Sequence, residues 1–560
     1  MSAPKAGDEL VFLPLGGSGE IGMNLNAYGY GPPDNRKWII VDLGVTFGGS
    51  DQPGVDIILP DPAFLESVKE NILGIVLTHA HEDHIGAVPW LWPRFKAPIY
   101  ATPFTAALVR EKLRERGLET KAKIIETPLK GIVTLGPFEI EYVTLTHSIP
   151  EPNGLAIRTP LGLVWHTGDW KIDPDPTIGE TTDEEALRKM RDEGVLAMVC
   201  DSTNVFVEEH TGSEAGVRDE LKKLFLTLKS RIAVAAFASN VARVQSVVLA
   251  AREAKRQVCL VGRSMLRVTA AAKAVGVLPA DINFISENEA AVLPKSKVLY
   301  LCTGSQGEPR AALSRIAAGE HRSVKIEQGD AVIFSSRVIP GNETSIYALY
   351  NRFAERGVEV VTDRDWPIHV SGHPSRVELV QMYKWARPRI AIPVHGERRH
   401  ILEHVKLALE LQTPEALAPR NGDLIRLAPG PAEVIDEAPS GRLYVDGEII
   451  IESDDEAMGE RRKLSADGAV TVTMAVNVKK RAIVSGPDVR VRGLSGGDDA
   501  GMDKLLEELA EAAELAYSKM SGAERNDEDA AEEIVARAVR RTAERSWGKR
   551  PMVEAVILTV

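Results

Sequence analysis

The chain has few of the features that cross-link a protein or place it in a membrane. Of its 560 residues only three are cysteine, and Cys200, Cys259 and Cys302 each lie in an apolar run typical of a buried strand. We therefore expect buried thiols, as in a reducing compartment, rather than disulfides or metal ligands. No apolar run approaches the length of a membrane span, and the start MSAPKAGDEL has no apolar signal core. These absences predict a cytoplasmic protein.

The chain also has no excess of positive charge. Its formal net charge is −13, which argues against a polyanion-binding surface spread over the whole molecule. A local basic groove is still allowed, because net charge averages over all faces. The chain is longer than a single domain with one hydrophobic core usually is, so we expect several domains.

A nucleotide-binding loop is missing as well, although residues 16–24 are rich in glycine (GGSGEIGMN). No Gly-Lys-Ser/Thr follows, and no helical pattern comes after the glycines. We therefore interpret this run as a tight turn where backbones approach closely. Asn24 and Asp42 are expected to be hydrogen-bonding residues near a functional site.

The most informative stretch follows the short apolar run 72–77, which predicts a buried strand. At its exit the sequence THAHEDH supplies four ligand-capable side chains within six residues, namely His79, His81, Asp83 and His84. Imidazole and carboxylate groups suit zinc or manganese. Two histidines separated by one residue can reach one ion while the Asp-His pair turns toward a second, so this loop predicts a two-metal site.

The same construction recurs further along the chain. Apolar strand-like runs end at His147, at Asp169 and at Asp201. Singly, each of these residues would more often be a turn or capping residue. Several strand ends that carry potential ligands are, however, what a metal site at one sheet edge requires.

From about residue 216 strands alternate with helices, which predicts a parallel sheet with right-handed crossovers. This α/β domain is expected to lie within the first domain, because ligand-type residues resume after it at His369, His373 and His395. Seven of the twelve histidines fall in these short stretches, at positions 79, 81, 84, 147, 369, 373 and 395. Solvated surfaces do not concentrate histidine in this way.

Together these motifs resemble a known family. The HxHxDH motif, LGGSGEIGMN, DSTN at Asp201, GSQGEP at Gly304, and the pair HVSGH and PVHGE resemble the β-CASP branch of the metallo-β-lactamase superfamily. Within that branch they look like the bacterial ribonuclease J family, over roughly residues 8–450. The implied fold is α/β: a metallo-β-lactamase αββα sandwich, an inserted parallel-sheet β-CASP domain and a small C-terminal α+β domain.

The resemblance also implies roles for individual residues. It assigns His79, His81 and His147 to one divalent ion, Asp83, His84 and His395 to a second, and Asp169 to both. Zinc is the expected metal, with manganese or magnesium as alternatives. Catalytic roles fall on Asp83, Asp201 and His373. A pocket for an RNA 5′-phosphate falls on Ser239, His369, Ser371, Gly372 and His373; Ser239 also lies at a strand-to-helix turn, where backbone N–H groups bind anions.

We predict five segments. They are a first part of the metallo-β-lactamase domain (1–215), the β-CASP domain (216–362), a second part of the first domain (363–430), a linker with a short returning strand (431–458) and the C-terminal domain (459–560). In the last, residues 459–493 are expected to form a half-buried sheet with a basic outer face, followed by helices at about 502–519 and 528–546 and a final strand. The basic face is either ordinary surface, an RNA contact or a subunit interface.

The implied function is hydrolysis of RNA phosphodiester bonds in rRNA processing, RNA maturation and mRNA decay. The family resemblance implies a zinc-dependent 5′-to-3′ exonuclease that prefers 5′-monophosphate ends and also cleaves internally. Single-stranded RNA is the expected partner, and a dimer or tetramer is expected through the C-terminal domain. The alternatives are a DNA-repair nuclease of the same branch, a thioesterase or lactonase, and a catalytically silent RNA-binding scaffold. The complete ligand set argues against the last.

Overall fold

The computed structural model describes residues 4–49, 51–339 and 341–560. The first residues of the start MSAPKAGDEL and position 340, within the expected loop RVIPGNE, lie outside these ranges. The chain folds as two compact units. One holds the residues up to Thr46 together with Leu59–Arg442, and the other holds Phe47–Ile58 and Leu443–Val560. In the described ranges, no helix is long and apolar enough to cross a membrane.

Two sheets pack face to face at the centre of the first unit. One has the order β24-β23-β1-β3-β4-β7-β8-β9 and the other β10-β11-β12-β13-β14-β20-β22. Phe12 and Tyr28 of the first sheet share a buried core with Ile140 and Ile157 of the second. Alternate side chains of each strand thus fill the space between the sheets.

The strands of the two sheets have the following bounds. The first sheet contains β1 (Glu9–Gly16), β3 (Leu25–Gly31), β4 (Lys37–Val41), β7 (Ile72–Val76), β8 (Ile99–Ala101), β9 (Ile124–Glu126), β23 (Asp423–Ala428) and β24 (Glu433–Glu437). The second contains β10 (Ile132–Leu135), β11 (Phe138–Thr144), β12 (Asn153–Thr159), β13 (Gly162–His166), β14 (Val195–Asp201), β20 (Ile390–Val394) and β22 (Glu415–Ala416). A small parallel pair joins β2 (Ser18–Gly19) to β21 (Gly396–Glu397).

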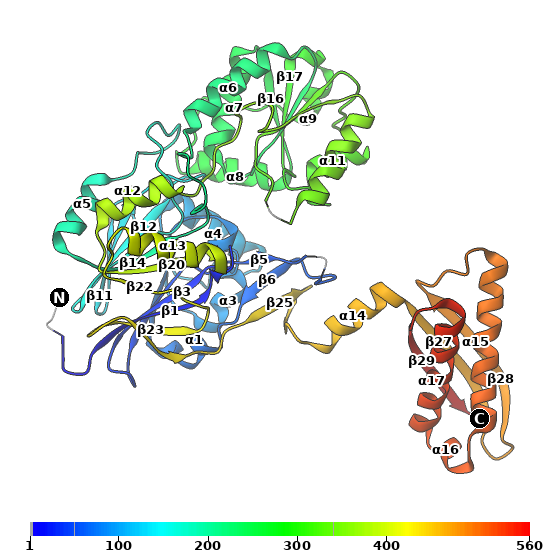
Figure 1. Cartoon of the computed structure of the whole chain (residues 1–560). Helices are drawn as coiled ribbons and strands as arrows, with labels where there is room; N and C mark the ends of the chain where they lie inside the picture. Colours follow the sequence, from blue (N-terminus) through cyan, green and yellow to red (C-terminus); the bar gives the residue numbers. More distant parts are fainter. Residues whose placement is uncertain (1–3, 50, 340) are drawn as a thin grey trace. The chain divides into compact units, whose positions relative to one another are not determined.

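Helices cover the outer faces of both sheets (Figure 1). Leu187 of α5, Leu379 of α12 and Leu407 of α13 pack on the outer face of the second sheet around Trp165. Helix α4 contacts β8 and β9 of the first sheet. The helices of the first unit outside the inserted domain are α1 (Ala63–Ser67), η1 (Lys69–Asn71), α2 (Glu82–Ile85), α3 (Val88–Phe95), α4 (Pro103–Glu115), α5 (Glu184–Glu193), α12 (Arg376–Ala386) and α13 (Arg398–Glu410).

A third sheet is inserted between β14 and α12, in the green part of Figure 1. Its order is β16-β17-β15-β18-β19 and all its pairs are parallel, which confirms the alternation expected from the sequence. The strands are β15 (Ile232–Ala235), β16 (Gln257–Val261), β17 (Val298–Cys302), β18 (Ala331–Phe334) and β19 (Glu359–Val361). The helices are α6 (Glu214–Thr227), α7 (Val241–Glu253), α8 (Arg263–Ala274), α9 (Glu287–Val292), η2 (Lys295–Lys297), α10 (Ala312–Ala318) and α11 (Glu343–Glu355).

The second unit contains a sheet ordered β28-β27-β29, with helices packed on one face. Its elements are α14 (Glu456–Asp467), β27 (Ala469–Asn477), β28 (Ala482–Arg492), α15 (Asp499–Lys519), α16 (Gly522–Asn526), α17 (Glu528–Trp547) and β29 (Met552–Thr559). Strands β25 (Arg442–Asp446) and β26 (Ile449–Glu452) lie within the stretch that we expected to be a linker with a short returning strand. They belong to a four-stranded sheet with β6 (Ile57–Pro60) and β5 (Thr46–Phe47).

One expectation for this unit was wrong. Residues 459–467 are helical rather than part of a basic sheet. They belong to helix α14, which begins at Glu456. The side chain of Asp455 caps that helix by accepting a hydrogen bond from the backbone N–H of Ala457. The helix shows little separation of apolar and charged faces, so the periodicity of the sequence did not reveal it.

Candidate metal centre

Each candidate ligand stands where a buried strand ends. Strand β7 leads into the loop that carries His79 and His81, β13 leads to Asp169, β14 ends at Asp201, and β20 leads to His395. These strands are mostly apolar and buried over most of their length, so the polar ligand side chains lie where the strands leave the sheets. As expected from the sequence, several apolar strands thus end at potential metal ligands.

The buried carboxylate of Asp42 organises the first of these loops. It accepts hydrogen bonds from the backbone N–H of Thr78 and from the Thr78 hydroxyl, both at 2.8 Å. It also lies 2.7 Å from Nδ1 of His84. Asp42 adopts a φ of 63°, a conformation that is strained for a residue with a side chain and that persists only where surrounding contacts enforce it. The expected hydrogen-bonding role of Asp42 is confirmed.

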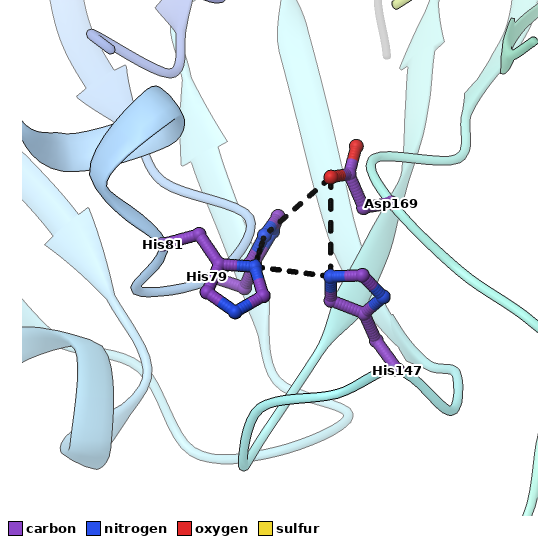
Figure 2. A group of neighbouring side chains, drawn as sticks. All are labelled: His79, His81, His147 and Asp169. Carbon is purple, nitrogen blue, oxygen red and sulfur yellow. Dashed lines mark hydrogen bonds and ion pairs between the residues drawn. The ribbon is translucent and has the colours of Figure 1, made fainter. Parts of the chain in front are cut away.

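Four side chains form a first group, shown in Figure 2. His79, His81, His147 and Asp169 each offer one ligand atom, and these atoms lie within 4.8 Å of one another. Nδ1 of His81 lies 3.1 Å from Nε2 of His79 and 3.0 Å from Nε2 of His147. Three imidazole nitrogens and one carboxylate that converge in this way are a donor set suited to zinc.

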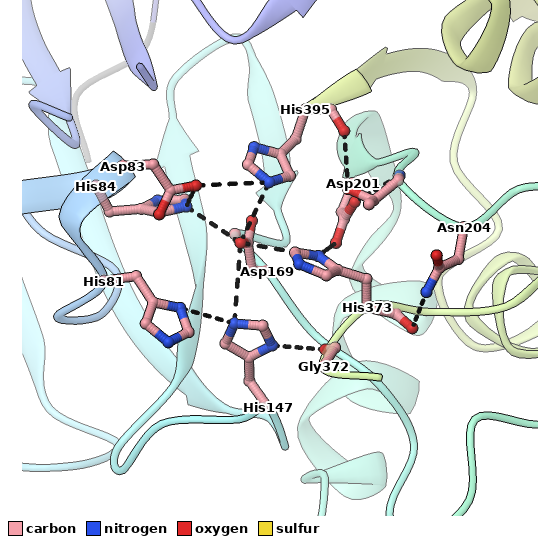
Figure 3. Close-up of polar contacts among 12 residues, drawn as sticks. His81, Asp83, His84, His147, Asp169, Asp201, Asn204, Gly372, His373 and His395 are labelled. Atoms are coloured by element: carbon pink, nitrogen blue, oxygen red, sulfur yellow. Dashed lines mark hydrogen bonds and ion pairs between the residues drawn. The ribbon is translucent and has the colours of Figure 1, made fainter. Parts of the chain in front are cut away.

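A second group shares the same carboxylate, as Figure 3 shows. It consists of Asp83, His84, Asp169 and His395. Oδ2 of Asp169 lies 3.2 Å from Nε2 of His84 and 3.4 Å from Nε2 of His395. Nε2 of His395 is buried without a hydrogen-bond partner. A buried nitrogen left unpaired is costly, and a cation bound here would supply the missing partner.

The outer ring nitrogens of these histidines are held by other groups. Nδ1 of His147 lies 2.5 Å from the carbonyl oxygen of Gly372, and Nδ1 of His395 lies 3.0 Å from Oδ1 of Asn24. With the contact of His84 Nδ1 to Asp42, these contacts hold the three rings by Nδ1 and turn Nε2 toward the centre. Such outer hydrogen bonds are the usual supports of metal-ligating histidines. The expected role of Asn24 beside the site is confirmed.

The protonation states of most candidate ligands also suit a cation. Burial, together with the neighbouring imidazoles, holds the pKa values of His79 and His147 well below the ordinary value, and burial lowers the pKa of His81 to about 4. Burial alone would raise the pKa of Asp169, but His395 and His84 hold that pKa well below its usual range. His84 differs, because burial lowers its pKa but Asp169, Asp83 and Asp42 outweigh this effect and raise that pKa well above the ordinary value. Since neutral imidazoles and ionised carboxylates are the forms that bind metal, a cation bound here would displace a proton from His84.

His373 and Asp201 also lie close to Asp169 (Figure 3). Nδ1 of His373 is 2.8 Å from Oδ2 of Asp201 and 3.8 Å from Oδ2 of Asp169. Burial lowers the pKa of His373, but the adjacent Asp201 outweighs this effect and raises the pKa to about 9. His373 therefore carries a proton at neutral pH, next to the centre and partly open to solvent.

The predicted phosphate pocket is brought together in part. His369, Ser371, Gly372 and His373 follow one another on the segment that returns from β19 to α12. Oγ of Ser371 accepts hydrogen bonds from Nδ2 of Asn204 at 2.8 Å and from the backbone N–H of His373 at 3.2 Å. Nδ1 of His369 is buried and unpartnered.

Ser239 belongs to another element. It directly precedes Asn240, whose side chain caps α7 by accepting a hydrogen bond from the backbone N–H of Arg243. The segment of His369 is joined to this helix through Arg243, which donates to the carbonyl oxygen of Ile368. Sequence reasoning missed Arg243, as well as the support that Thr78 gives to Asp42. A hydrophobic run gives no signal for an arginine buried within it.

Comparison with known proteins bears directly on this geometry. Residues 26–170 match the metallo-β-lactamase superfamily, and residues 229–353 match the ribonuclease J β-CASP domain. Residues 357–419 match a Zn-dependent metallo-hydrolase RNA specificity domain, and residues 456–560 match the ribonuclease J C-terminal domain. These matches confirm the predicted fold class.

Relatives that match this chain along nearly its whole length are found in several bacteria. The chain is 47% identical over 553 residues to a ribonuclease J of Sinorhizobium meliloti, with 99% of this chain and 98% of the relative covered. It is 39% identical over 560 residues to a ribonuclease J of Corynebacterium glutamicum, with 99% and 77% covered.

A solved structure shares the fold. The crystal structure of a protein of unknown function from Enterococcus faecalis V583 superposes with a TM-score of 0.52 at 16% identity, over 75% of this chain and 100% of that chain. The motifs, the two sheets with their inserted domain, and the full-length relatives agree: the chain belongs to the ribonuclease J family.

Proposed function

We propose that this protein is a metal-dependent ribonuclease that hydrolyses RNA phosphodiester bonds. The observation that carries the proposal is the pair of donor groups that share Oδ2 of Asp169. They lie in a chain that also matches an RNA specificity domain. Such paired sites serve in-line displacement at phosphorus.

Two divalent ions fit the donor atoms, and zinc is the metal we expect. His79, His81 and His147 would hold one ion, Asp83, His84 and His395 the other, and Asp169 both. When bound, the ions supply an activated water and neutralise charge that develops on the phosphoryl group. Manganese and magnesium are the alternatives that metal analysis would distinguish.

The remaining steps belong to side chains of the chain. His373 carries a proton that it can donate to the scissile phosphate or to the leaving oxygen. Asp201 orients His373 through the 2.8 Å contact with Nδ1 and keeps the ring protonated. Asp83 is only partly buried, so it can meet the attacking water at the open side of the centre.

We further propose that RNA is degraded from the 5′ end, with additional internal cleavage. Ser239, His369, Ser371, Gly372 and His373 would hold the terminal 5′-monophosphate. Nδ1 of His369 offers a buried, unsatisfied polar atom, and the turn at Ser239 leads into the N-terminus of α7, where anions are favoured. A pocket with few donors suits a monophosphate and disfavours a triphosphate. Each cut then regenerates the same kind of end.

In the cell we expect this activity to serve rRNA processing, RNA maturation and mRNA decay in the cytoplasm. Single-stranded RNA is the proposed partner. Self-association, as a dimer or tetramer, is proposed to involve the C-terminal domain of residues 459–560. We also propose the domain boundaries predicted from the sequence, with the β-CASP domain at residues 216–362 and the C-terminal domain at residues 459–560.

A matched set of oligonucleotides tests the proposal. RNA with a 5′-monophosphate, a 5′-triphosphate or a 5′-hydroxyl is compared with DNA of the same sequence. We expect mononucleotides to be released from the 5′ end of the monophosphorylated RNA at the highest rate. Faster hydrolysis of the DNA would instead favour a repair nuclease of the same branch, and binding without any hydrolysis would favour a silent scaffold.

A further inference from the structure

A fully buried arginine lies between the inserted domain and the metal centre. The side chain of Arg243, in the first turn of α7, is 1% exposed. Its Nε and one terminal nitrogen donate to the carboxylate of Glu214 at 3.0 and 2.8 Å. The other terminal nitrogen donates to the carbonyl oxygen and the hydroxyl of Ser335 at 2.8 and 2.7 Å, and to the carbonyl oxygen of Ile368 at 3.1 Å. One guanidinium thus joins three segments.

The contact with Ile368 fixes the start of the functional segment. Ile368 directly precedes His369, and the same segment continues through Ser371 and Gly372 to His373. Ser335 strengthens this contact, because its hydroxyl also donates to the carbonyl oxygen of Ile368, at 2.7 Å. The position of the segment is therefore set from the inserted domain at this end, and from the carbonyl contact of Gly372 with His147 at the other.

The contact with Glu214 leads to the loop of Asp169. The backbone N–H of Glu214 donates to Oδ2 of Asp173 at 3.0 Å. Asp173 in turn pairs with the buried ammonium group of Lys171 at 3.0 Å. Lys171 lies two residues beyond Asp169, and its backbone N–H donates to the carbonyl oxygen of Thr146, next to His147. A continuous chain of contacts therefore runs from Arg243 to the loops of two candidate ligands.

Stability of the inserted domain does not account for this arrangement. Arg231 and Asp330 already form an ion pair of 3.0 Å at the start of β15 and β18. Arg243 lies beyond the opposite ends of these strands, where Ser335 follows β18. A buried ion pair is also weak support for a fold, because desolvation offsets much of the attraction. Two of the segments that Arg243 joins lead to the site, because Ile368 directly precedes His369 and Glu214 contacts Asp173 in the loop that follows Asp169.

We infer that Arg243, with Glu214, is a positioning residue that holds the His369–His373 segment in register with the Asp169 loop. This inference rests on the proposed function, because it sets where a bound RNA end and the proton of His373 lie relative to the metal ligands. A displacement of about 1 Å at such a site can reduce a rate by roughly 100-fold. Loss of this positioning should lower kcat for RNA, because RNA cleavage needs both the phosphate pocket and His373.

The test compares two substrates and two matched variants. Bis(p-nitrophenyl) phosphate has a leaving group that needs little protonation and carries no 5′-monophosphate end for the proposed pocket, so it reports mainly on the metal centre. Arg243→Lys keeps the charge but lacks the fork that reaches three segments. Arg231→Lys is the control, because it weakens a similar ion pair at the far ends of the same strands. Thermal unfolding of both variants shows whether they fold.

We expect Arg243→Lys to lower the ratio of kcat for RNA to kcat for the small diester by about tenfold or more, and Arg231→Lys to leave that ratio unchanged. An unchanged ratio in Arg243→Lys would overturn the inference, and so would an equal fall in Arg231→Lys. A wild-type protein that hydrolyses the small diester but no RNA would instead overturn the proposed function, and the inference with it.

Discussion

At the scale of single residues, the site depends on close approaches that leave no room for extra atoms. A Cβ atom added at Gly372 would lie 2.7 Å from Cε1 of His147 and 2.7 Å from Oγ of Ser148. The carbonyl oxygen of this glycine also holds Nδ1 of His147. The glycine therefore contributes both a contact and the absence of a side chain.

We expect Gly372→Ala to push the His147 ring out of place and to lower metal affinity by about 10–100-fold, as the loss of an outer support usually does. Metal titration followed by calorimetry checks this. Gly216→Ala is the control, since a Cβ there meets nothing within 4 Å and alanine favours helix α6. Equal affinities in wild type and Gly372→Ala would show that the ring tolerates the methyl group.

The 5′-end preference is a second prediction at this scale. Ser239→Ala combined with Ser371→Ala removes two hydroxyls from the proposed pocket and leaves every proposed metal ligand in place. The preference for 5′-monophosphate over 5′-hydroxyl RNA should fall by about fivefold or more, as expected for the loss of hydrogen bonds to a charged group. Internal cleavage of a circular RNA should change little. A double variant that keeps its end preference would remove these serines from the pocket.

At the scale of elements, buried histidines connect helices to the site. His404 of α13 contacts the hydroxyl of Ser202 through Nδ1 at 2.9 Å and the hydroxyl of Tyr383 in α12 through Nε2 at 3.1 Å. Ser202 follows Asp201, so this histidine ties two helices to the loop that orients His373. Burial lowers the pKa of His404 to about 4 from its ordinary value of 6.5.

This shift predicts a pH dependence of stability. Because the unfolded chain binds the proton more tightly, the contribution of neutral His404 is complete above pH 6.5 and is lost as the pH falls toward 4. His404→Gln should be less stable at pH 7, and its deficit should shrink by roughly 3 kcal/mol across that window. Urea unfolding at several pH values measures this deficit. A deficit that stays constant with pH would contradict the assignment.

Elements also show what the sequence could and could not reveal. The strands that end at His79, Asp169 and Asp201 could be predicted, because each apolar run and the ligand that follows it are adjacent in the sequence. The partnership of Arg243 with Glu214 was not readable, since it joins residues 29 apart through the packing of α6 on α7. Helix α14 was missed because its sequence, EAMGERRKLSAD, separates apolar from charged faces too weakly to show a helical period.

At the scale of the whole molecule, the second unit is the candidate for self-association. In the sheet ordered β28-β27-β29, strand β29 lies at an edge, and it exposes Leu558 to 53%. An exposed apolar edge strand is a ready template for pairing with a second copy. The family match to a C-terminal domain covers this sheet.

We therefore expect a chain truncated after Asp455, just before α14, to sediment as a monomer, while the full chain sediments as a dimer or tetramer. Leu558→Lys in the full chain is the matched point variant and should weaken association by placing charge on the edge. Sedimentation velocity at several concentrations checks both. Unchanged sedimentation coefficients, corrected for mass, would assign this domain another role.

The central claim is that two donor groups share Asp169 in one hydrolytic metal centre. Its most direct test is the metal content of Asp169→Ala and wild type, measured by elemental analysis alongside RNA hydrolysis and circular dichroism. We predict about two divalent ions per wild-type chain, as in other paired sites. The variant should remain folded, bind fewer ions and lose more activity than the ~10–100-fold that an outer support costs. An Asp169→Ala variant that keeps the wild-type metal content and rate would contradict the claim.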